Sequence, residues 1–86
     1  MVIRELRGRQ EINDESGKAI GLYYFLVNEN DYYKIEVVKD MGEFFSSEIT
    51  YPIAKSRDYV IVLLDILQRN KVTPMCLLEH VDELLN

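Results

Sequence analysis

The fold of this chain is decided near its end, by the stretch Lys71-Val72-Thr73-Pro74-Met75-Cys76-Leu77-Leu78-Glu79-His80-Val81-Asp82-Glu83-Leu84-Leu85. Thr73 can cap a helix, and Pro74 suits the first helical position because no N–H is needed there. Val72 before the cap and Leu77 four residues into the helix have the spacing of a hydrophobic staple, which fixes the angle at which the preceding segment arrives. The stretch therefore predicts a helix over 74–85 with a braced entry.

This helix is expected to be amphipathic, with acidic residues opposite an apolar stripe of Leu77, Leu78, Val81, Leu84 and Leu85. Before it, Ser56 is a good cap and Asp58 complements the positive helix terminus, which predicts a helix over 56–70. Apolar residues from Tyr59 to Leu67 cover most of its circumference. The β-branched cluster at 60–62 also fits a strand, but the cap and the length favour a helix.

From Val2 to Ala54 the sequence consists of short extended runs separated by turn residues. The predicted strands are Val2–Ile12, Ala19–Val27, Tyr32–Lys39 and Phe44–Ile53, and Pro52 belongs at the end or the edge of the last one because it cannot donate to a ladder. Only three residues separate the helices, which predicts a helical hairpin. We therefore predict one α+β domain over 1–86, a four-stranded antiparallel β-meander followed by a C-terminal two-helix hairpin on one sheet face.

The predicted core combines one side of the second and third strands with the inner sides of both helices. It comprises Leu22, Tyr24, Leu26, Ile35, Val37, Val60, Leu63, Leu64, Leu67, Leu77, Leu78, Val81 and Leu84.

The second strand is apolar on both sides, and the helices can cover only one of them. Exposed aromatic surface tends to mark a contact with another molecule, and a small domain gains stability from added burial. Together with the nearly all-round apolar first helix, this predicts a homodimer or a protein partner. The expected interaction surface comprises Tyr23, Phe25, Val27, Tyr59, Val62 and Ile66.

Charge argues against a general nucleic-acid binder. Ten basic and fifteen acidic residues give a formal net charge of −5, which repels a polyphosphate. Arg4, Arg7 and Arg9 could form a local basic patch, with Lys18 as a neighbour. Interleaved Glu5 and Glu11 favour a neutralised, solvated strand face instead.

Cys76 is the single cysteine, which excludes an internal disulfide and a thiolate zinc knuckle. A reducing compartment fits this usage. No apolar run approaches the roughly 20 residues that span a bilayer, and Arg4 and Glu5 stand where a signal peptide would have its apolar segment. We expect a cytoplasmic protein without a membrane partner, a metal or a cofactor.

Two alternative functions are also considered, a reaction at Cys76 and His80 and the binding of single-stranded nucleic acid. Cys76 and His80 are spaced i, i+4 near a helix start, an arrangement that would suit a small enzyme or a thiol-reactive protein. The plainer interpretation makes Cys76 a small, partly buried apolar residue and His80 a surface residue. The sheet aromatics could instead stack on single-stranded nucleic acid, but such proteins usually pair aromatics with a basic groove.

No phosphate-binding glycine pattern or nucleophile elbow is present, so the sequence favours a non-enzymatic interaction or regulatory module that self-associates. The segments Tyr32-Tyr33-Lys34-Ile35-Glu36-Val37-Val38-Lys39 and Asn70-Lys71-Val72-Thr73-Pro74, with the amphipathic tail, resemble a family of short uncharacterised proteins from clostridia and related Firmicutes. The resemblance covers about three quarters of the chain. It implies a common fold and a bacterial cytoplasmic setting, and it brings no activity, cofactor or site residue.

Overall fold

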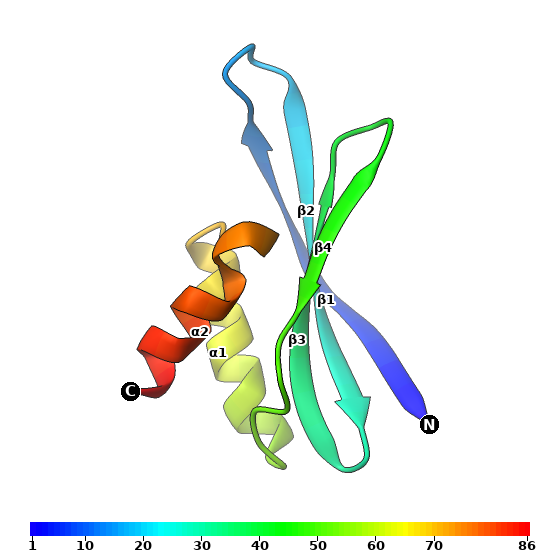
Figure 1. The fold of residues 1–86 in the computed structure, drawn as a ribbon, viewed down its shortest axis with the longest axis vertical. Helices are drawn as coiled ribbons and strands as arrows, with labels where there is room; N and C mark the ends of the chain where they lie inside the picture. The colour runs from blue at the N-terminus through cyan, green and yellow to red at the C-terminus, as the bar shows by residue number, and fades with distance from the viewer.

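A four-stranded antiparallel sheet forms the first part of the chain, in a computed structural model that describes residues 1–86. The strands β1 (Val2–Asn13), β2 (Ala19–Glu29), β3 (Tyr32–Asp40) and β4 (Phe45–Ile49) lie in chain order across the sheet. Helix α1 (Arg57–Arg69), a 3₁₀ turn (Pro74–Cys76) and helix α2 (Leu77–Leu85) follow (Figure 1). The predicted α+β fold, a meander followed by two helices, is therefore confirmed.

The first hairpin turn is built by Asp14, whose carboxylate accepts bonds from the backbone N–H groups of Ser16 and Lys18, at 2.8 and 2.9 Å. Gly17 has a φ of +85°, a conformation that residues with a Cβ rarely adopt. The hairpin ends that join β1 to β2 and β3 to β4 extend beyond the helices (Figure 1).

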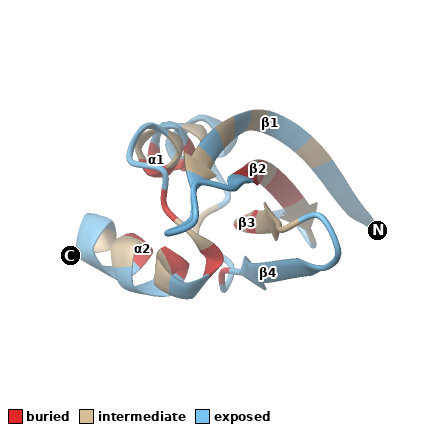
Figure 2. Cartoon of the chain, turned by 90° about the horizontal axis from the view of Figure 1, so that it is seen from above, coloured by how far each residue is buried: buried red, intermediate tan, exposed pale blue.

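Both helices lie on the same side of the sheet, and the other side carries no helix (Figure 2). Alternate residues of β2 and β3 meet the inner sides of α1 and α2 there, because side chains along a strand alternate between faces. The resulting core comprises Leu22, Tyr24, Leu26, Ile35, Val37, Val60, Leu63, Leu64, Leu67, Val72, Leu77 and Val81.

The core prediction is wrong for two residues. Leu78 and Leu84 are each 38% exposed, because α2 buries Leu77 and Val81 and these two lie on the flanks of that narrower stripe. Val72, predicted only as half of a staple with Leu77, is itself buried in the same core. The connection between the helices is therefore part of the packed interior.

Helix α1 begins as predicted, since the Ser56 hydroxyl accepts a bond from the backbone N–H of Tyr59 at 3.2 Å. The entry to α2 differs from the prediction. Thr73 makes no side-chain capping bond, and the segment from Pro74 to Cys76 is a tight 3₁₀ turn, so that α2 begins only at Leu77.

Strand β4 is shorter than predicted, since its ladder to β3 ends at Ile49 and not at Ile53. Thr50 is buried, and its hydroxyl accepts a bond from the N–H of Ile35 at 3.0 Å in place of a regular ladder bond. Pro52 has no N–H for a ladder. The chain returns to β3 at Ala54, whose carbonyl oxygen accepts from Tyr33 N at 2.8 Å.

Neither helix combines the length and the apolar character needed to cross a bilayer.

Candidate interaction surface

The six residues predicted as an interaction surface lie on two separate parts of the molecule. Tyr23, Phe25 and Val27 point to the sheet face that carries no helix, which we call the open face, because their neighbours in β2 face the core. The other three lie on α1, on the opposite side of the sheet. The structure therefore does not join them into one surface.

The apolar row of β2 on the open face is covered by charged side chains of the same chain. The Arg4 guanidinium lies 3.6 Å from the centre of the Phe25 ring and also pairs with Glu36 of β3. Arg9 donates to the Tyr23 hydroxyl at 3.2 Å. Beneath this cover Val27 is only 2% exposed. Long charged side chains thus shield apolar strand positions that alternation alone would leave open.

On α1, Tyr59 and Val62 are 47% and 57% exposed, and Ile66 is half-buried. Their spacing places them on one side of the helix, away from the sheet. Asp58 and Asp65 lie four residues before and three residues after Val62, so carboxylates flank this α1 stripe.

Strand β4 is the most exposed element of the sheet, since all five of its residues are exposed (Figure 2). Phe45 is 68% and Ile49 is 42% exposed, and both side chains point to the open face opposite Asp40 and Glu36 of β3. Sequence reasoning missed this strand as a site. The available signal was the adjacent pair Phe44-Phe45 in a short run with a single charge, Glu48.

Strand β4 also presents outward-facing backbone groups at the edge of the sheet, of which the Ile49 N–H donates to the Glu48 carboxylate at 3.3 Å. Thr50 N donates to Ile35 O at 2.9 Å and Met41 N donates to Phe44 O at 3.1 Å, so the even-numbered residues bond to β3. Antiparallel ladders alternate in this respect. The N–H and C=O groups of Phe45, Ser47 and Ile49 therefore point outward from the sheet.

The opposite edge, β1, is protected against strand addition. Its pairing with β2 shifts register between Leu6 and Gly8, which is a β-bulge, and charged residues stand at five of its twelve positions, Arg4, Glu5, Arg7, Arg9 and Glu11. Bulges and charges are the usual means by which proteins block a sheet edge. Strand β4 has no bulge or proline.

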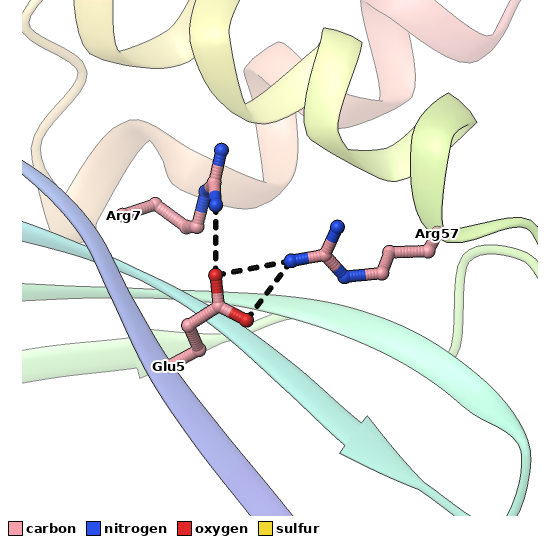
Figure 3. A network of polar contacts seen from close by, with 3 residues as sticks. All are labelled: Glu5, Arg7 and Arg57. Carbon is pink, nitrogen blue, oxygen red and sulfur yellow. Dashed lines mark hydrogen bonds and ion pairs between the residues drawn. The ribbon is translucent and has the colours of Figure 1, made fainter.

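The arginines of β1 are paired locally. Glu5 accepts bonds from Arg7 at 2.8 Å and from Arg57 of α1 at 3.0 and 3.1 Å (Figure 3). These guanidinium groups, Arg7 first, lower the pKa of Glu5 below its usual value. Arg9 pairs with Glu11 at 3.4 Å. The neutralisation expected from interleaved Glu5 and Glu11 is therefore present.

Two pockets lie on the helix side of the sheet. The first, about 240 Å³, is lined by Ile3, Glu5, Leu26, Asn28, Tyr33 and Arg57. Its charged groups already pair with each other. The second, about 310 Å³, lies near the hairpin ends and is lined by Asp14, Lys18, Ile20, Lys39, Met41, Glu43 and Phe44. No group of three or more His, Cys, Asp or Glu side chains is placed to hold a metal ion.

Cys76 and His80 lie close together, but the imidazole Nδ1 contacts the backbone carbonyl oxygen of Cys76, at 3.0 Å. Cys76 is half-buried and packs against the core. The imidazole is therefore engaged by a backbone carbonyl group one helical turn before it.

Comparison with known proteins places this chain in a family. A model described as a family of unknown function (DUF6514) matches residues 3–86, and the chain therefore belongs to that family. Searches of the curated proteins and of the solved structures found no match.

Proposed function

We propose that this member of the DUF6514 family is a small, non-enzymatic protein-interaction module that self-associates as a homodimer. One observation supports the proposal most strongly, the asymmetry of the sheet edges. Strand β1 carries a bulge and five charged residues, whereas β4 presents outward backbone groups beside exposed Phe45 and Ile49. An edge of this kind binds another strand through main-chain hydrogen bonds, and its side chains provide specificity.

The interface is small. A five-residue edge is shorter than a standard protein interface, so we expect a dissociation constant on the order of 1–100 μM. Association at such concentrations suits a regulated module rather than a permanent assembly.

Sedimentation velocity from low to high micromolar concentration tests the proposal. The edge-blocking variant is Ser47→Pro, because the Ser47 N–H points away from β3 and proline removes only that outward donor. Ser47→Ala keeps the donor and is the matched control. We expect dimers for wild type and Ser47→Ala and monomers for Ser47→Pro. A wild-type chain that stays monomeric throughout contradicts self-association.

The α1 stripe of Tyr59, Val62 and Ile66 stays a prediction of a separate contact site. Val62→Lys places a charge on it without touching β4. If the homodimer uses β4, this variant dimerises like wild type. A dimer lost in Val62→Lys and kept in Ser47→Pro would move the interface to α1.

A further inference from the structure

We infer that two copies join β4 to β4 in antiparallel orientation about a two-fold axis at Ser47, so that their sheets become continuous. This inference rests on the proposed self-association and specifies its geometry. The argument uses the direction of the β4 backbone groups and the order of its side chains, Phe45-Ser46-Ser47-Glu48-Ile49.

The backbone favours this register. In an antiparallel pair, residues with groups pointing toward the partner exchange both N–H···O bonds with the residue opposite. When Ser47 lies opposite the partner's Ser47, Phe45 lies opposite the partner's Ile49. Ile49 then lies opposite the partner's Phe45. Every outward N–H and C=O of both edges then has a main-chain partner, and the Ile49 N–H exchanges the Glu48 carboxylate for the carbonyl oxygen of the partner's Phe45. A register centred on Ser46 or on Glu48 leaves one outward-facing residue of each copy beyond the end of the other strand.

The side chains favour the same register. Phe45 and Ile49 both lie on the open face, so the two apolar side chains of one copy meet their counterparts across the junction. On the helix side, Glu48 lies opposite the partner's Ser46. A register centred on Glu48 would set two carboxylates directly opposite each other, which is destabilising.

The chain offers this edge to a second copy more readily than to a charged strand. The β4 sequence is complementary to itself when reversed, with apolar ends, two serines and one carboxylate. The helices leave room at the start of β4, because the strand begins at the β3–β4 hairpin end, which extends beyond them (Figure 1). A two-fold axis at Ser47 places the helices of the two copies at opposite ends of the paired β4 strands.

Cysteine cross-linking tests the register. In a Cys76→Ser background, Ser47→Cys places two thiols on the axis, at a Cα separation of about 5.5 Å that a disulfide can bridge. The matched control is Ser46→Cys, one residue away, whose copies would be about 7–8 Å apart along a diagonal. Under mild oxidation we expect Ser47→Cys to form a covalent dimer at least about tenfold faster than Ser46→Cys.

Amide hydrogen exchange gives a second readout that needs no substitution. Raising the concentration of wild type should slow exchange at Phe45, Ser47 and Ile49, with the change at Ser46 and Glu48 smaller because β3 already holds their N–H groups. A dimer that cross-links faster through Ser46→Cys, or that protects none of the three outward amides, overturns the register and leaves self-association standing. A strict monomer overturns both.

Discussion

The hydroxyl of Tyr24 in β2 donates a hydrogen bond of 2.9 Å to the carbonyl oxygen of Val72, in the connection between the helices. Both residues are buried, Tyr24 completely. The bond ties a central strand to the segment that sets the direction of α2. It also gives the Val72 carbonyl a partner in a place without access to water.

Replacing Tyr24 by phenylalanine should therefore destabilise the fold without changing its shape. Tyr24→Phe keeps the ring but leaves the Val72 carbonyl unpaired, so we expect the free energy of unfolding to fall by about 1–3 kcal/mol. Urea denaturation followed by circular dichroism measures this change. The control Tyr32→Phe, at an exposed position, should change it by less than about 0.5 kcal/mol. Equal effects of the two substitutions would contradict the role of this bond.

Alkaline pH gives an independent check on Tyr24. Burial raises the pKa of Tyr24 from 10.0 to about 12, so its neutral phenol is favoured in the folded state. The stability from this shift is present below pH 10 and is lost as the pH rises through about 12. The stability advantage of wild type over Tyr24→Phe should consequently shrink between pH 8 and pH 11, measured by urea denaturation at each pH. An advantage that stays constant would show that the phenol keeps its ordinary titration.

Acid should weaken the link between β1 and α1 through Glu5. The Arg7 and Arg57 guanidinium groups lower the pKa of Glu5 from 4.5, so its contribution to stability is present above that pH and is lost as pH falls below it. Glu5→Gln should show a smaller drop in urea midpoint between neutral and acidic pH than wild type. The control Glu15→Gln lies in the exposed β1–β2 turn and should retain the wild-type drop. If all three proteins lose the same stability in acid, Glu5 does not contribute to the acid dependence.

Hydrophobic periodicity predicted most of the architecture because alternation in the strands and the caps of the helices are local signals. Leu22, Tyr24 and Leu26 share a face in any regular strand, and Ser56 marks a helix start in any context. The end of β4 depended on a distant event, the replacement of a ladder bond by the Thr50 side chain. Leu78 and Leu84 were misjudged because a helical stripe does not show how wide its contact with the sheet will be.

The candidate site was less predictable for a related reason. Alternation placed Tyr23, Phe25 and Val27 on the open face, but it carries no information on Arg4 and Arg9, whose long side chains reach across from β1. The exposed edge of β4 depends on which strand ends the sheet. The predicted meander already placed the last strand at an edge, and the strand order confirms this. The sequence did not show which backbone groups of β4 point outward, because that depends on its register with β3.

Gly8 provides a test of how α1 meets β1. A Cβ at this position would overlap the side-chain amide of Gln68 on α1. In a Gln68→Ala background, Gly8→Ala should stabilise the protein by about 0.5–1 kcal/mol, the usual gain from replacing glycine in a strand. With Gln68 present that gain should disappear, because the amide must move. A double-mutant cycle from urea denaturation measures the coupling, and additive effects would contradict this contact.

Cys76 should behave as a structural thiol. Its neighbour His80 contacts the Cys76 carbonyl oxygen, so the imidazole is engaged by the backbone. We expect alkylation by iodoacetamide at neutral pH to be slower than that of a free thiol in solution, because Cys76 is half-buried. His80→Ala should leave the rate within about twofold of wild type. Rapid alkylation that slows in His80→Ala would instead support the thiol-reactive alternative.

Arg4 should stabilise the open face by covering it. Its guanidinium stacks on Phe25 and pairs with Glu36, contributions of about 0.5–1 kcal/mol and 0.2–1 kcal/mol at such exposed sites. We expect Arg4→Ala to lower the free energy of unfolding by about 1 kcal/mol and to increase binding of a hydrophobic dye, since Phe25 and Val27 lose their cover. Arg4→Lys should recover only part of the loss, because an ammonium group does not stack as a planar guanidinium does. If Arg4→Ala binds no more dye than wild type, side chains other than Arg4 cover the open face of β2.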